Sequence, residues 1–130
     1  MKPKILVVED DHDYAGFLKG VIEKAGGEVL HEDEAKAAIR FIKLGGNYDL
    51  LLSDWSFHYQ EGGMRGIEAC GVEIIAASKQ KNPDCKAYLL SALGGCIEDR
   101  GEADRIFDKA NYRYVSEKLE RKVLELVRGF

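Results

Sequence analysis

The chain has 130 residues, of which 45% are hydrophobic and 32% charged, with 14 glycines, 2 prolines and a formal net charge of -4. This composition excludes a disordered, collagen-like or disulfide-scaffolded chain, and the length suits a single domain, residues 1–130, with its own core. The excess of negative charge disfavours direct binding to nucleic acid or to an anionic membrane surface.

The first half of the chain alternates predicted strands with predicted helices. A continuous apolar run at Lys4–Val8 predicts a buried strand. Apolar residues over Tyr14–Ala25 then recur at three- and four-residue steps, which predicts a helix that ends at Gly26-Gly27. A weaker strand, Glu28–His31, leads into a second predicted helix over Ala35–Leu44.

The second half continues the alternation of strands and helices. Its predicted elements are, in chain order, the strand Asp49–Leu52, the helix Ile67–Lys81, the strands Lys86–Leu90 and Arg105–Phe107, and the helix Ser116–Arg128. Ser116 is expected to cap the last helix, and the glycine-interrupted segment between Leu93 and Asp104 predicts only a short fourth helix. Continuous rather than alternating apolarity indicates parallel strands covered on both faces, so we expect a three-layer α/β fold.

The cysteines, histidines and apolar segments predict neither a zinc site nor a membrane span. Cys70, Cys85 and Cys96 follow no CxxC or Cys/His spacing, so we expect free thiols, and the three histidines share no metal-ligand spacing. The N-terminus lacks a signal-peptide pattern, and no stretch approaches roughly 18 apolar residues. We therefore expect a cytoplasmic protein without membrane insertion.

Polar side chains stand where the predicted strands end. They are Glu9, Asp10 and Asp11 after the first strand, Asp54 after the third, Ser91 after the fourth and Lys109 after the fifth. In an open parallel sheet these ends share one edge, where ligands bind. Clustered carboxylates repel one another and favour a hard cation such as Mg²⁺, and an aspartyl carboxylate can accept a phosphoryl group.

Each of these residues also has an ordinary structural interpretation. Asp10 and Asp11 could cap the first helix, while Ser91 and Lys109 could be a strand-end hydroxyl and a surface lysine. Their occurrence together at one edge favours the chemical interpretation. A flavin-binding electron carrier or a dinucleotide dehydrogenase is disfavoured, because acids stand where a glycine-rich phosphate loop would be needed.

Four segments carry a resemblance to a known family. They are, in chain order, Lys4–Asp11, Tyr48–Asp54, Leu89–Ala92 and Ile106–Lys109. Together they resemble the receiver domain of two-component response regulators (CheY-like). The resemblance implies a flavodoxin-like sheet of order 2-1-3-4-5 with helices on both faces. The implied site consists of Asp54 as phosphoacceptor, Glu9, Asp10, Asp54 and the Ser56 main-chain carbonyl as Mg²⁺ ligands, and Ser91 and Lys109 as contacts to the phosphoryl group.

The same resemblance implies a stand-alone phosphoacceptor in a phosphorelay. A histidine kinase or a histidine phosphotransfer protein would donate the phosphoryl group, and a downstream protein target would bind the phosphorylated form differently. The protein would catalyse its own phosphorylation. Its dephosphorylation would be slow, because neither Ser56 nor Leu93, at the positions that influence attack by water, is an acid or an amide. The alternative is a pseudo-receiver that takes no phosphate and binds a partner constitutively.

Four features depart from the family pattern. The segment 57–64, between Asp54 and the expected helix-leading Gly66, is longer than usual and lacks a Met-Pro pair. The span from Ser91 to Lys109 is shorter than usual by about one helical turn. Ala110 follows Lys109 where the family has a proline after a cis bond, and Ile106 stands at the aromatic switch position. We therefore expect altered loops around the site.

Overall fold

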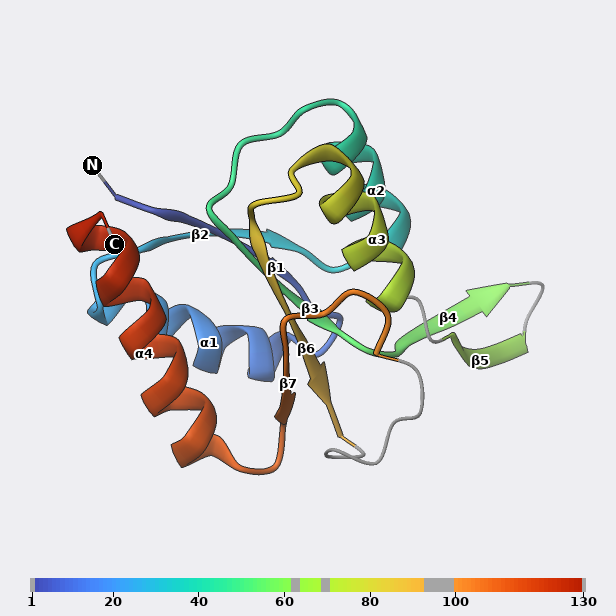
Figure 1. Ribbon diagram of the computed structural model, residues 1–130. Coiled ribbons are helices and arrows are strands. Elements are labelled where there is room, and N and C mark those ends of the chain that lie inside the picture. Colours follow the sequence, from blue (N-terminus) through green and yellow to red (C-terminus); the bar gives the residue numbers. More distant parts are fainter. Residues whose placement is uncertain (1, 62–63, 69–70, 93–99, 130) are drawn as a thin grey trace.

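A computed structural model of the chain describes residues 2–61, 64–68, 71–92 and 100–129, with the backbone alone for 58–61 and 64–68. Its main sheet contains the strands β1 (Lys4–Val8), β2 (Glu28–Glu32), β3 (Leu50–Asp54), β6 (Lys86–Ser91) and β7 (Arg105–Asp108). The order across the sheet is β2-β1-β3-β6-β7, and every neighbouring pair is parallel (Figure 1). The predicted order 2-1-3-4-5 is therefore confirmed.

Helices cover both faces of this sheet, as expected. The described helices are α1 (His12–Lys24), α2 (Ala35–Lys43), α3 (Gly71–Lys81) and α4 (Tyr112–Arg128). Figure 1 shows α1 and α4 on one face and α2 and α3 on the other. Two cores result: Leu18 and Leu119 pack with Phe107 on the first face, whereas Ile42 and Ile75 pack with Leu51 on the second. None of the described helices combines the length and the apolarity that crossing a bilayer requires.

The last helix begins earlier than predicted. It starts at Tyr112, and its N-cap is Asn111, whose side chain accepts the N–H of Tyr114 at 3.2 Å. The prediction that Ser116 caps this helix is wrong. The first turn of α4 lacks the apolar spacing of the later turns, so the sequence pattern placed the start of the helix too late. The predicted short helix between Leu93 and Asp104 falls largely on 93–99, outside the described residues.

The segment after β3 forms a hairpin that the sequence analysis did not predict. Strands β4 (Phe57–Glu61) and β5 (Met64–Glu68) pair antiparallel as a separate two-stranded sheet. Figure 1 shows this hairpin extending away from the three layers. Gly66 lies within β5, so the prediction that it leads the third helix is wrong, as is the predicted helix start at Ile67. The helix begins at Gly71 instead.

One of the three predicted free thiols, Cys85, lies in the described part of the chain. Cys85 is a free, half-buried thiol, and burial raises its pKa to about 11. Cys70 and Cys96 lie outside the described residues. At neutral pH the Cys85 thiol is therefore protonated, which does not favour nucleophilic or metal-binding chemistry.

Candidate functional site

Three carboxylates meet at the carboxyl edge of the central strands. Glu9 directly follows β1, Asp54 is the last residue of β3, and Val8 is paired with Ser53 across these two strands. The pairing therefore brings the two strand ends side by side. Carboxylate oxygens of Glu9, Asp10 and Asp54 all lie within 4.8 Å of one another. Glu9 is fully buried and Asp54 is 6% exposed, so the cluster is largely removed from bulk water.

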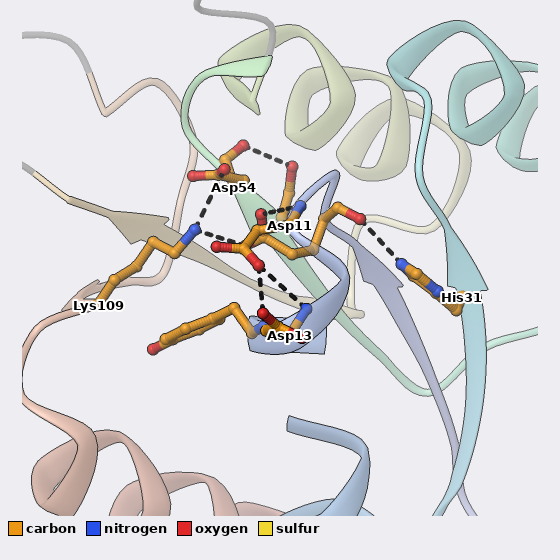
Figure 2. A network of polar contacts seen from close by, with 8 residues as sticks. Asp11, Asp13, His31, Asp54 and Lys109 are labelled. Carbon is orange, nitrogen blue, oxygen red and sulfur yellow. Dashed lines mark hydrogen bonds and ion pairs between the residues drawn. The ribbon is translucent and has the colours of Figure 1, made fainter. Parts of the chain in front are cut away.

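Lys109 supplies the positive charge of this cluster. It directly follows β7, and its main-chain N–H donates to the Ser91 carbonyl at 2.9 Å, which ties it to the end of β6. Its Nζ donates to Glu9 Oε2 at 2.8 Å and to Asp54 Oδ2 at 3.4 Å. Figure 2 shows the Lys109 side chain extending towards Asp54. The ends of β1, β3 and β7 thus bring two carboxylates and an ammonium group into direct contact.

Burial shifts the ionisation of all three groups. It raises the pKa of Glu9 to about 7, with a further contribution from the Asp54 charge, and the contact with Lys109 only partly opposes this rise. Burial likewise raises the pKa of Asp54 more than Lys109 lowers it. For Lys109, burial acts to lower the pKa, but the hydrogen bond to Glu9 and the two acid charges outweigh it and raise the pKa. The cluster is therefore short of positive charge.

The neighbouring acids have different roles. Asp11 is the N-cap of α1, and its side chain accepts the N–H groups of Asp13 and Tyr14 at 3.0 and 3.2 Å (Figure 2). The capping interpretation therefore holds for Asp11, whereas Asp10 belongs to the carboxylate cluster. His31 Nε2 donates to the Glu9 main-chain oxygen at 2.9 Å, which fixes the backbone of the acidic loop.

The other predicted site residues lie around the same edge. Ser91 ends β6 and is buried, one residue beyond Leu90, the partner of Asp54 in the β3–β6 pairing. Ser56 is half-buried two residues after Asp54, and a metal contact through its carbonyl stays a prediction. Leu93 lies outside the described residues. The Lys109–Ala110 peptide bond is trans.

The aromatic switch position is occupied differently from the family pattern. Ile106 is half-buried and packs on the α2 and α3 side of the sheet. The neighbouring Phe107 is fully buried in the opposite core, where its ring meets Tyr88 edge-on at 5.3 Å between centroids. Position 106 therefore carries no ring that could rotate, and the nearest ring in the sequence, Phe107, points into the opposite core.

Gly71 is a site residue that the sequence analysis missed. Its N–H donates to the Trp55 carbonyl at 3.0 Å, and it brings the first turn of α3 against the end of β3. A Cβ at this position would clash with the main-chain oxygen of Asp54 and would lie 2.7 Å from Trp55 Cα. Only glycine allows this close approach to the backbone that carries Asp54.

Replacing Gly71 with alanine is therefore expected to destabilise the protein by about 1–3 kcal/mol, because α3 must move away from β3. Thermal or urea unfolding measures the change. Gly16→Ala is the matched control, because a Cβ there meets nothing within 4 Å and alanine favours a helix interior. Equal stability of the Gly71→Ala and unsubstituted proteins would contradict the close packing.

Comparisons with known proteins agree with this geometry. No protein-family model matches the chain. The structure of response regulator TrrA from Thermotoga maritima, in complex with Mg(2+)-BeF, is 30% identical, with a TM-score of 0.70 over 95% of this chain and 100% of that one. A receiver domain protein (CheY-like) from Methanospirillum hungatei has a TM-score of 0.72 at 21% identity over 100% of both chains. The phosphorylated cyanobacterial phytochrome response regulator RcpA has a TM-score of 0.72 at 16% identity.

A curated sequence relative is longer than this chain. The uncharacterized transcriptional regulatory protein YrkP of Bacillus subtilis is 36% identical over 70 residues, which are 54% of this chain. The matched part spans 28% of YrkP, so the similarity covers little more than a quarter of that protein.

Proposed function

This chain belongs to the receiver-domain family of response regulators, and from that premise we propose that Asp54 accepts a phosphoryl group from phosphohistidine. The receiver fold supports a role in two-component signalling. The donor would be a histidine kinase or a histidine phosphotransfer protein. The phosphorylated chain would then bind a downstream protein target differently.

The observation that carries this proposal is the buried contact of Lys109 with both Glu9 and Asp54 at one sheet edge. A surface lysine and two unrelated acids would not converge in this way. The ammonium lies where it can neutralise a charge that develops next to Asp54, which is how positioned cations accelerate phosphoryl transfer. Ser91, buried at the adjacent strand end, is proposed to donate its hydroxyl to a phosphoryl oxygen.

The carboxylate cluster fits a magnesium ion. Mg²⁺ prefers hard oxygen ligands and keeps several of its waters, and Glu9, Asp10 and Asp54 offer carboxylate oxygens within 4.8 Å of one another. We propose these three acids, with the Ser56 carbonyl, as the ligands. When bound, the ion would neutralise the transferring phosphoryl group. The relative TrrA was solved with Mg(2+)-BeF, which supports the same assignment.

The transfer itself needs an ionised Asp54. A carboxylate oxygen of Asp54 attacks phosphorus in line, a P–O bond forms, and the P–N bond to the donor histidine breaks. The imidazole nitrogen leaves with the bonding electron pair and takes up a proton. Because burial raises the pKa of Asp54, additional positive charge in the cluster favours the reactive form.

The alternative function is a pseudo-receiver that binds a partner without phosphate. The β4–β5 hairpin favours it, because this insertion directly follows β3, which ends in Asp54, and would give a partner a surface that does not depend on phosphate. The buried contact of Glu9 and Asp54 with Lys109 weighs against it. Burying charged groups costs free energy, and a protein that takes no phosphate would gain nothing in return.

Mass measurement after incubation with acetyl phosphate, with and without Mg²⁺, tests the proposal. The expected result is a mass increase of one phosphoryl group that is stable in mild conditions, is lost on hydroxylamine treatment, and requires Mg²⁺. The fluorescence of Trp55, the single tryptophan, should respond to Mg²⁺ in the same samples. Absence of both the mass increase and the fluorescence response would favour the pseudo-receiver.

A further inference from the structure

The ammonium of Lys109 has a third neighbour besides the two carboxylates. Nζ lies 4.6 Å from the centroid of the Tyr14 ring, within the range of a cation–π interaction. The other two cation–ring pairs in the described parts of the chain are longer, at 6.0 Å for Arg105 over Tyr88 and 5.5 Å for Lys118 over Tyr114. The Lys109 side chain is only 13% exposed, and loss of water strengthens the attraction of an ammonium for a ring face.

The Tyr14 ring is held in place from several sides. Its backbone N–H donates to the Asp11 side chain in the first turn of α1, next to the acidic loop. Its ring contacts Phe17 and Tyr112, with centroids 5.4 and 5.5 Å away. Tyr112 is the first residue of α4, and Lys109 lies in the loop just before it. The ring therefore joins the loop that carries the acids to the loop that carries the lysine.

The hydroxyl of Tyr14 does not explain why a tyrosine stands here. The hydroxyl oxygen is buried and finds no hydrogen-bond partner among the residues that the structure describes. Burial raises the pKa of Tyr14 well above its usual range, so the phenol stays neutral. An unpaired buried hydroxyl is unfavourable for stability. The ring face, rather than the hydroxyl, is the part of this side chain that contacts the site.

We infer that Tyr14 is a positioning residue, whose ring face holds the Lys109 ammonium between Glu9 and Asp54 in readiness for a phosphoryl oxygen. This inference rests on the proposed function of Asp54. A lysine ammonium sits on a flexible four-carbon stem, so each contact that it makes restricts its position. The ring face, 4.6 Å from Nζ, adds a third contact to the two carboxylates, so removing it lowers the fraction of time that Nζ spends at the acceptor.

Variants of Tyr14 test this inference. Tyr14→Phe keeps the ring face and removes the unpaired hydroxyl, whereas Tyr14→Leu removes the ring, and Tyr14→Met replaces it if the leucine variant unfolds. The control Phe17→Leu removes aromatic area from the same cluster without removing the face beneath Lys109. NMR of the Lys109 ε-methylene protons reports ring shielding, and the initial rate of labelling by acetyl phosphate at saturating Mg²⁺ reports function.

The unsubstituted protein, Tyr14→Phe and Phe17→Leu are expected to show shielded ε protons and similar labelling rates. Tyr14→Leu and Tyr14→Met should lose the shielding and label about tenfold more slowly, the factor that corresponds to a partly desolvated cation–π contact. Shielding that survives without the ring, or equal slowing in Tyr14→Phe, would overturn the inference. If the unsubstituted protein takes no label, the proposed function fails, and the NMR measurement still decides whether Tyr14 holds Lys109.

Discussion

Replacing Asp54 with asparagine is expected to abolish phosphoryl labelling by acetyl phosphate. The amide has nearly the same shape as the carboxylate, so packing at the end of β3 is preserved. The amide lacks the anionic oxygen that would attack phosphorus. Intact-mass measurement in Mg²⁺ should therefore show no phosphorylated species, the largest change we expect from any single substitution.

The matched control for this experiment is Asp108→Asn. Asp108 lies at the same edge, is the last residue of β7 and accepts the Ala110 N–H at 3.0 Å, but it is exposed and outside the carboxylate cluster. This variant should be labelled like the unsubstituted protein. Labelling that persists in Asp54→Asn would place the acceptor elsewhere, and loss of labelling in both variants would point to a general effect of charge at this edge.

The stability of the ion-free protein is expected to fall as the pH rises from about 4.5 to about 7. In the unfolded chain Glu9 ionises near its ordinary pKa of 4.5, whereas burial raises its pKa to about 7 in the folded chain. The folded state therefore binds more protons within this window, so the free energy of unfolding decreases with pH. The raised pKa of Asp54 acts in the same direction. Glu9 alone would contribute up to about 3 kcal/mol, which urea unfolding across this pH range can measure.

Saturating Mg²⁺ should reverse this pH dependence. Ionised carboxylates bind the cation and protonated ones do not, so the stabilisation by Mg²⁺ grows as the protons leave. Glu9→Gln is the control, because it removes the titrating group and should flatten the ion-free curve. An unchanged fall of stability in Glu9→Gln, or a Mg²⁺ curve identical to the ion-free one, would show that the cluster does not govern this behaviour.

The main sheet was predictable because its sequence pattern has one physical explanation. The apolar runs at Ile5–Val8 and Leu50–Leu52 contain no polar alternation, and the structure buries them on both faces. Parallel strands between two helical layers are the arrangement that requires this pattern. The same reasoning placed Glu9, Asp54 and Lys109 at one edge, because every carboxyl end of a parallel sheet lies on the same side.

The hairpin and the start of α3 were missed because two signals competed. Ile67 stands seven and eight residues before Ile74 and Ile75, a spacing that fits one face of a helix, so the helical pattern extended too far towards the N-terminus. The better signal was the Gly62-Gly63 pair, a dipeptide that commonly joins two antiparallel strands. Residues flanking that pair form β4 and β5.

Tyr14 and Gly71 could not be assigned from local sequence, because their roles depend on contacts between distant elements. The spacing of α1 identifies Tyr14 as a core residue, which is correct, but its position beneath Lys109 results from the packing of α1 against α4. The contact of Gly71 with the Asp54 backbone likewise depends on how α3 docks on β3. Neither distance is encoded in a short pattern.

The hydrogen bond between Gly71 and Trp55 closes the base of the β4–β5 excursion. The chain leaves the three layers after Trp55 and returns to them at Gly71, and within this excursion Phe57 is buried in the second core. The entropy of closing such an excursion changes by only about 0.6 kcal/mol when its length doubles. Changes in the length of the hairpin beyond Phe57 are therefore expected to cost little free energy, and they leave intact the sheet that brings Glu9, Asp54 and Lys109 together.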